Sequence, residues 1–225
     1  MDLSLPQAIL LLSLNDETGK TEAGYYQPAL SGAAMADLFL RGTLELQDNP
    51  EAVIALRHRQ SLGAFLGMCD GAIGSAPKPQ ALRIWIGQLA TQKDFIATLA
   101  DELCHLGALT RAHTKVFGLF TRTVWPEASP ALEMQLKSEM AHAMFEDYGA
   151  VEERLGLVIA LADAVDLLDH NFDPAKLTEH ADRVAKIAAG ERLSSTSSEA
   201  VVKTVKTAIR AANTMADSIT ATIIQ

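Results

Sequence analysis

Two Glu-x-x-His units are the residues of this sequence whose types and spacing come closest to a known chemistry. Glu102 precedes His105 by three positions, and Glu139 precedes His142 by the same spacing. Two such units on helices, together with two further glutamates, hold the two metal ions of ferritin-like bundles. The apolar stripes of these segments, however, leave both glutamates near the stripe's edge and both histidines about 120° from its centre. The two units could therefore form a di-metal site or lie at ordinary surface positions, and the helical geometry favours the surface positions.

A second row of ionisable residues lies further along the chain. Asp163, Asp166 and Asp169 recur every third residue, and His170 follows them directly. Such a row could hold a cation or supply an acid and a base. The same spacing is also typical of a solvated acidic helix face, which is the interpretation that we favour.

The catalytic motifs that can be read directly from a sequence are missing. There is no GxSxG nucleophile elbow, no P-loop, no GxGxxG after a strand and no HExxH. Gly67, Gly71 and Gly74 resemble a phosphate loop only in their glycines, because no Lys-Ser/Thr pair follows them. We therefore expect no catalytic residues, no metal ion and no cofactor.

The charge balance limits the partners of the chain. It has 225 residues, 48% of them apolar, and a formal net charge of −9. A net acidic protein is repelled by phosphate backbones and anionic membranes, so an anion would need a local pocket. A helix ending near residue 40, followed by a hairpin and by Arg57, His58 and Arg59, is typical of winged-helix DNA binders. Three basic residues on so acidic a chain argue against that function, and we expect no nucleic-acid partner.

The cysteines and the N-terminus predict a cytoplasmic protein. Cys69 and Cys104 are far apart and form no CxxC unit, which fits two small buried thiols in a reducing compartment, with one disulfide as the alternative. Asp2 stands where a signal peptide would be positive. Residues 8–14 form an apolar run much shorter than the ~20 residues that a spanning helix needs.

The spacing of apolar residues predicts helices over most of the chain. Ser4 followed by Pro6 is typical of a capped helix start. The predicted helices cover residues 8–14, 28–40, 81–89, 95–106, 132–145, 151–168 and a last segment after a polar loop at 194–198, where Thr196 and Glu199 match a capping box. Alternation predicts one hairpin over residues 43–56 and another over 109–125, and the glycines and prolines of 67–79 predict a loop. The expected fold is all-α: a helical bundle core surrounded by amphipathic helices with two small β-hairpins, in one domain over residues 1–225.

Read in order, several segments resemble the Golgi phosphoprotein 3 family. The segment that is most specific is 37–46, DLFLRGTLEL, which is similar to the family's second helix and first strand. The resemblance spans nearly the whole chain and also rests on LPQAILLLSLNDETG at 5–19, WIGQL at 85–89, GAL at 107–109, 117–126 and 154–168 with Asn171 and Phe172. Because Met1 nearly begins the similar region, we expect a single-domain, bacterial-type member without the basic N-terminal tail of eukaryotic members.

The resemblance implies a protein without enzyme activity that binds phosphatidylinositol 4-phosphate at a membrane surface. Eukaryotic members use this binding to sort glycosyltransferases in the Golgi. A phosphate pocket of this kind needs arginines that fork onto phosphate oxygens and an aromatic ring beside them.

Residue by residue, the family's site is only partly present. Its tryptophan falls in a loop of different length, where Tyr25 or Tyr26 stands in its place. One family arginine is Ser31 here, and two more fall on Lys93 and Ile96. The lipid-binding residues implied by the resemblance are therefore Tyr25, Tyr26 and Lys93, and a lysine cannot make the bidentate contact of an arginine.

Two functions follow as alternatives. One is a peripheral membrane adaptor that recognises an anionic, phosphoinositide-like lipid head group. The other is a helical protein–protein interaction module that has lost phosphoinositide binding. In the second case the later hairpin would bind a protein partner or pair two copies of the chain through its apolar residues, Val116, Phe117, Leu119, Phe120 and Trp125.

Overall fold

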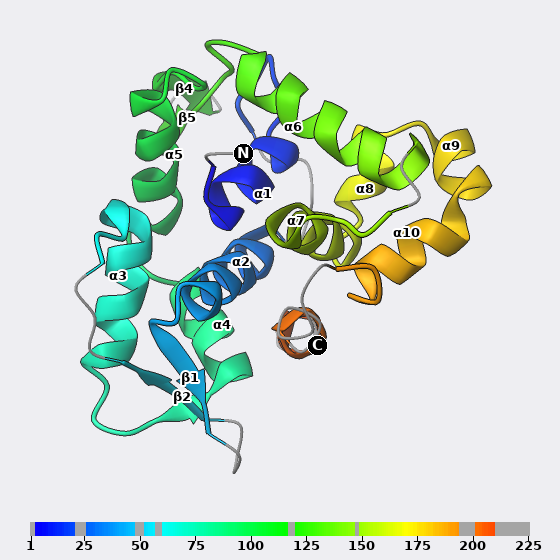
Figure 1. The fold of residues 1–225 in the computed structure, drawn as a ribbon. Coiled ribbons are helices and arrows are strands. Elements are labelled where there is room, and N and C mark those ends of the chain that lie inside the picture. The colour runs from blue at the N-terminus through cyan, green and yellow to red at the C-terminus, as the bar shows by residue number, and fades with distance from the viewer. Residues whose placement is uncertain are drawn as a thin grey trace, which may run out of the picture.

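The computed structural model describes residues 3–20, 26–47, 52–56, 60–116, 120–146, 149–193 and 201–209. Its helices are α1 (Leu5–Ser13), α2 (Tyr26–Leu40), α3 (Gly63–Gly74), α4 (Leu82–Ala90), α5 (Phe95–His105), α6 (Ala131–Ala141) with a π-helical continuation η1 (His142–Glu146), α7 (Glu153–Asp163), α8 (Leu167–Asn171), α9 (Pro174–Glu179) and α10 (Ala181–Ala188). Residues 201–209 form a further helical segment. The predicted all-α fold with two small sheets is confirmed (Figure 1).

The centre of the bundle consists of α1, α2 and α7. Figure 1 shows α3, α4 and α5 on one side of these helices and α6, α8, α9 and α10 on the other. Every residue of α1 except Gln7 is buried, and so is the whole run from Gly156 to Ala162 in α7. Helices that are apolar all round are stable only inside a protein. Ser4 caps α1 as predicted: its Oγ accepts from the backbone of Gln7, whose side chain accepts from the backbone of Ser4.

The two small sheets are antiparallel. The first contains β1 (Leu44–Leu46), β2 (Ala52–Ala55) and β3 (Gln80–Ala81) in that order, and β3 leads directly into α4. The second is the hairpin of β4 (Ala112–Val116) and β5 (Phe120–Val124), in which Ala112 pairs with Val124. Both predicted hairpins are therefore confirmed, and the third strand of the first sheet is an addition that the sequence did not predict.

The loop predicted over residues 67–79 is wrong for its first half, which belongs to α3. Phe65, Cys69 and Ile73 are buried along one face of this helix. The ring of Phe65 packs 4.8 Å from that of Phe95 in α5, measured between centroids. Burial of this apolar face outweighs the low helix propensity of the glycines, which the prediction had followed.

The helix predicted over residues 151–168 is divided into α7 and α8. Asp166 lies between them in the left-handed region, at φ 58°, which a continuous helix cannot accommodate. Helices α9 and α10 were not predicted. The predicted capping box at Thr196 and Glu199 lies outside the described residues.

Residues 201–209 dock against the bundle at a glycine. A Cβ on Gly32 of α2 would lie 2.4 Å from Ile209 Cδ1 and 3.2 Å from Val205 Cγ1, so only glycine allows this close approach. On the other side, Lys206 Nζ donates to Asp163 Oδ2 and to the carbonyl of Ala188, both at 2.8 Å. The segment thus bridges α2, α7 and the end of α10, and its residues Val202, Val205, Ala208 and Ile209 are buried.

Candidate functional site

The three residues that the family resemblance implies as lipid-binding differ in how much of their surroundings the structure describes. Tyr25 is outside the described residues, and Tyr26 is the first residue of α2, where its side chain is not described. Lys93 is exposed in the turn between α4 and α5 and forms no ion pair with any described residue. The lining of the four cavities described below does not include Lys93.

The two positions to which the resemblance assigned family arginines, Ser31 and Ile96, both pack into the bundle, Ser31 completely and Ile96 in part. Ser31 is fully buried in α2, and its Oγ donates to the carbonyl of Gln27 at 3.1 Å. Ile96 is partly buried and packs against the hydrophobic core. The buried hydroxyl of Ser31 is not accessible to a ligand, and Ile96 carries no charge that could bind a phosphate.

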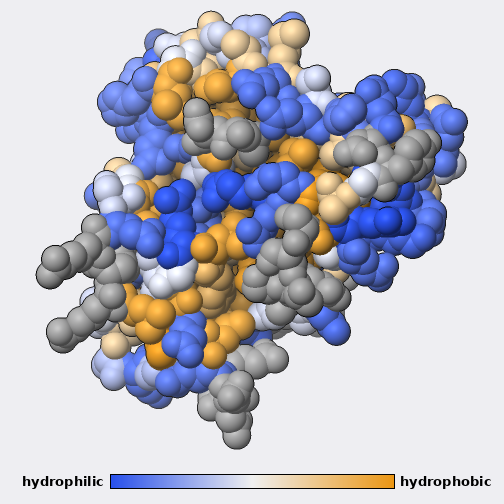
Figure 2. Space-filling view, viewed as in Figure 1, coloured by the Kyte–Doolittle hydropathy of each residue, from blue (hydrophilic) through white to orange (hydrophobic). Residues whose placement is uncertain are grey.

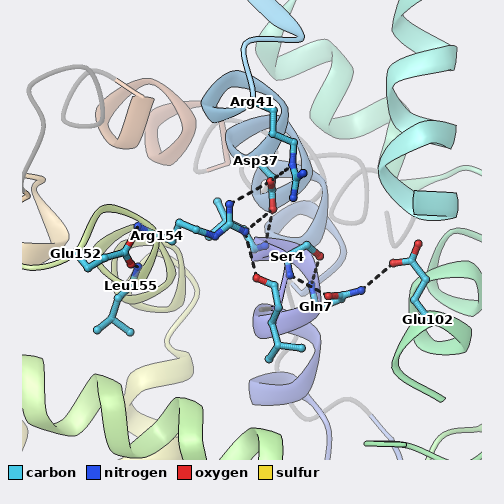
Figure 3. A network of polar contacts seen from close by, with 10 residues as sticks. Ser4, Gln7, Asp37, Arg41, Glu102, Glu152, Arg154 and Leu155 are labelled. Carbon is cyan, nitrogen blue, oxygen red and sulfur yellow. Dashed lines mark hydrogen bonds and ion pairs between the residues drawn. The ribbon is translucent and has the colours of Figure 1, made fainter. Parts of the chain in front are cut away.

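The most extensive polar contacts surround Asp37, the start of α1 and Arg154, which we call the Asp37 network (Figure 3). Asp37 is fully buried and accepts from Leu5 N at 2.7 Å, Arg41 Nε at 2.7 Å and Arg154 Nη2 at 3.0 Å. Arg154 also donates to the carbonyl of Leu3 at 3.1 Å. Burial by itself would raise the pKa of Asp37, but the hydrogen bonds and positive charge of Arg154, followed by Leu5 and Arg41, hold it below its usual value. The buried carboxylate is therefore charged and fully satisfied.

Glu102, one of the two Glu-x-x-His glutamates, holds the start of another helix. Its Oε1 accepts from Phe65 N at 2.9 Å, and its Oε2 accepts from Gln7 Nε2 at 3.0 Å (Figure 3). Leu62 precedes α3 and supplies no side-chain cap, so a carboxylate from α5 takes that role. Gly63 allows this approach, because it has φ 76° and a Cβ there would lie 3.0 Å from Glu102 Oε1. Sequence patterns could not reveal this contact, since its partners are far apart along the chain.

The second Glu-x-x-His unit is engaged in local surface contacts. Glu139 Oε1 accepts from Gln135 Nε2 at 2.8 Å, and His142 Nδ1 lies 3.1 Å from Glu146 Oε2. The structure does not gather the two units into a group of metal-ligating atoms within the described part of the chain. The surface interpretation of these units is the one that the contacts support.

A different acidic group is brought together by the fold. Carboxylate oxygens of Asp16, Glu127 and Glu133 lie within 4.8 Å of one another. Lys137 Nζ lies 2.5 Å from Glu133 Oε1 and so neutralises part of this charge. Burial raises the pKa of Glu133, and it also raises the pKa of Glu127, where Asp16 adds to the effect. The three residues come from separate parts of the chain, which is why no spacing in the sequence revealed them.

The acidic row of residues 163–170 does not form one site. Asp163 Oδ2 accepts a hydrogen bond from Lys206 Nζ of the 201–209 segment, whereas His170 Nδ1 lies 2.8 Å from the backbone carbonyl oxygen of Asp166. Asp169 is exposed. These side chains have separate structural roles or face solvent.

Both cysteines are free thiols, as the sequence favoured. Burial, reinforced by Asp70 and Glu102, raises the pKa of Cys69 to about 12. A thiol with this pKa stays protonated near neutral pH and is a poor nucleophile. Cys69 is therefore a core residue and not a reactive group.

The second hairpin shows a polar outer surface in the part that is described. His113, Lys115 and Arg122 are exposed, whereas Trp125 packs against the core. The other apolar residues proposed for partner binding, Val116, Phe117, Leu119 and Phe120, have no described side chains.

A cavity of about 350 Å³ lies between the start of α4 and the 201–209 segment, and we call it the α4 groove. It is lined by Ala81, Leu82, Arg83, Lys203, Thr204, Thr207 and Ala208. Its two cations, Arg83 and Lys203, are far apart in the sequence, so no motif pointed to them.

The fold and contacts define a mainly helical protein with a buried ionic network between α1, α2 and α7. Within the described residues, no helix has the length and apolar character needed to cross a membrane. The family model described as Golgi phosphoprotein 3 (GPP34) matches residues 5–212. The chain belongs to this family. A search of curated proteins finds no match.

Proposed function

We propose that this chain is a non-enzymatic peripheral membrane protein that binds an anionic, phosphoinositide-like lipid head group. Membership of the family is the ground for this proposal. The supporting observation is Lys93, which stands exposed after α4 without an ion pair to any described residue. An unpaired lysine can attract an anionic surface at low desolvation cost.

The side chains with the best-known chemistry support a non-enzymatic role. Glu102 caps α3, Asp37 holds the start of α1, and Cys69 is buried with a raised pKa. Groups committed to such contacts cannot also act as a general base or nucleophile without breaking the fold.

Flotation of the full chain with phosphatidylcholine vesicles, with and without phosphatidylinositol 4-phosphate, tests this proposal. We expect binding only to vesicles that contain the phosphoinositide. Reversal of one surface charge changes the electrostatic attraction by about 2 kcal/mol, so Lys93→Glu should weaken binding at least about tenfold. Lys115→Glu is the matched control, because Lys115 is equally exposed on β4. Absence of binding to both sets of vesicles would refute the proposal.

The second candidate is a helical protein–protein interaction module without a lipid site. The burial of Ser31 and the partial burial of Ile96 favour it, because neither of these two expected basic positions offers a positive charge to a lipid head group. Figure 2 shows apolar surface over the region of β1, β2 and α4 and near the middle of the viewed face, interrupted by hydrophilic groups. Sedimentation velocity over a wide concentration range is the test, and a monomer at every concentration with no recoverable partner would count against this function.

A further inference from the structure

The α4 groove is distinguished by the charge of its lining. Of its seven described lining residues, Arg83 and Lys203 are cations, and none of these seven carries a carboxylate. Both cations are exposed, and neither forms an ion pair with a described residue. On a chain with a net charge of −9, two cations that line one groove without an ion pair to a described residue are unexpected.

The other three cavities show the usual balance of charges. In the second, Lys203 and Lys206 share the lining with Asp163 and Glu191. In the third, Lys137 lies with Asp16, and in the fourth, Arg41 lies with Glu102. Three of these cations, Lys137, Lys206 and Arg41, also form ion pairs at 2.5–2.8 Å. Among the described lining residues of these four cavities, those of the α4 groove alone include two cations that lack a described ion pair and include no carboxylate.

We propose that the α4 groove binds a phosphomonoester anion. Arg83 presents a planar guanidinium that can fork onto two phosphate oxygens, and Lys203 adds a point charge from the opposite wall. Thr204 is half-buried in the lining, its hydroxyl forms no hydrogen bond with a described residue, and this hydroxyl can donate to a phosphate oxygen. Thr207 donates to the carbonyl of Lys203 at 2.8 Å and fixes the wall locally. The volume of about 350 Å³ suits a phosphate with a small attached group.

This site is separate from the position of Lys93. Arg83 is the second residue of α4, while Lys93 follows the end of that helix. Nine helical residues span about 13 Å, and Lys93 is not among the described residues that line the α4 groove. The inference therefore does not depend on the proposed lipid function, and each can fail without the other.

The phosphate that binds in the groove can belong to a free phosphomonoester or to a lipid head group. Both present the same dianionic group to Arg83 and Lys203. The exposed Ile84, next to Arg83 in α4, lies where an apolar contact with a bilayer would accompany head-group binding. Two arms of one experiment separate these sources.

In the first arm, inorganic phosphate is titrated into the full chain and followed by backbone amide NMR signals of Arg83 and Lys203. We expect saturable shifts, and a loss of affinity of about tenfold or more in the double variant Arg83→Gln and Lys203→Gln, because charge-assisted hydrogen bonds are removed. Thr204→Val should weaken binding severalfold, and Lys93→Gln should leave it unchanged. No saturable shift, or equal affinity in the wild type and the double variant, would overturn the proposal.

In the second arm, vesicles of phosphatidylcholine with phosphatidic acid are used in flotation. Binding that depends on Arg83 and Lys203, and not on Lys93, assigns the groove to a lipid head group. If phosphate binds in the first arm while these vesicles do not, the groove takes a free phosphomonoester. Circular dichroism of each variant verifies that its fold is intact, which we expect because both cations are exposed.

Discussion

The Asp37 network and the α4 groove each contain arginine, but the charges around these arginines differ. In the network, one fully buried carboxylate accepts from both Arg41 and Arg154. In the groove, Arg83 and Lys203 are exposed, and the described residues of the lining include no acid. Paired, buried charges fix the arrangement of helices, whereas unpaired charges at a surface are available to a ligand.

Loss of a charged residue should therefore have different effects in the two regions. Loss of a charge in the network leaves its partners buried without compensation, so it should affect stability. Loss of a charge in the groove leaves nothing unsatisfied, so it should affect binding alone. The following substitutions test this separation.

The largest effect is expected for Asp37→Ala. It leaves Leu5 N without its acceptor and Arg41 and Arg154 without their shared carboxylate, and it should lower the free energy of unfolding by about 3 kcal/mol. Urea denaturation measures this change. Asp169→Ala is the control, because Asp169 is exposed, and it should change stability by less than about 0.5 kcal/mol.

The pH dependence of the same pair of proteins provides a second test of the network. The pKa of Asp37 is lowered in the fold, so its stabilisation is complete above the unfolded-state pKa, near 3.9, and is lost as pH falls through the lower folded value. The stability difference between the wild type and Asp37→Ala should therefore shrink below about pH 4. A difference that stays constant down to the acid transition would show that the charge of Asp37 is not what stabilises the fold.

Gly32→Ala should have the next largest effect. The added Cβ meets Ile209 and Val205, so the 201–209 segment must shift, at a cost of about 1–2 kcal/mol. Because that segment forms one wall of the α4 groove, phosphate affinity should fall as well. Gly87→Ala is the matched control: its Cβ would meet nothing within 4 Å, and it should stabilise α4 by about 0.5–1 kcal/mol. Equal thermal stabilities of the two variants would contradict the docking described here.

Glu102→Ala should cost about 1 kcal/mol, the usual effect of losing a helix cap. The backbone N–H of Phe65 loses its acceptor, and so does Gln7 Nε2. Glu139→Ala, in the other Glu-x-x-His unit, removes only an exposed contact with Gln135 and should change stability by less than about 0.5 kcal/mol. Equal losses in the two variants, measured by urea denaturation, would mean that the two units have the same role after all.

The smallest effect on stability is expected for Arg83→Gln and Lys203→Gln. Each side chain is exposed and makes no ion pair with a described residue, so the free energy of unfolding should change by less than about 0.5 kcal/mol. A decrease in the free energy of unfolding comparable to that of Asp37→Ala would show that these cations stabilise the fold. It would contradict the proposed difference between the Asp37 network and the α4 groove.

Helix positions could largely be predicted from the sequence, because the spacing of apolar residues reports which face is buried. The start of α1 is an example, since Ser4 caps it as its position before Pro6 suggested. The prediction was wrong for α3, where the glycines indicated a loop. Contacts such as that of Phe65 with Phe95 decide this segment, and they bring together residues from two helices.

The candidate sites were much less predictable. The resemblance to the Golgi phosphoprotein 3 family led to Tyr25, Tyr26 and Lys93, and the structure describes the environment of Lys93 alone among their side chains. The α4 groove was missed because Arg83 and Lys203 approach each other only after the 201–209 segment docks on α2.

The sequence by itself determined the helical class, the two hairpins and the family, since these depend on local spacing and on ordered similar segments. The tertiary structure alone decided what each charged residue does. Asp37 and Arg154 are 117 positions apart, and Gln7 and Glu102 are 95 positions apart. The energy of a charge depends on which groups and how much water surround it, and in this chain those neighbours come from distant segments that only folding brings together.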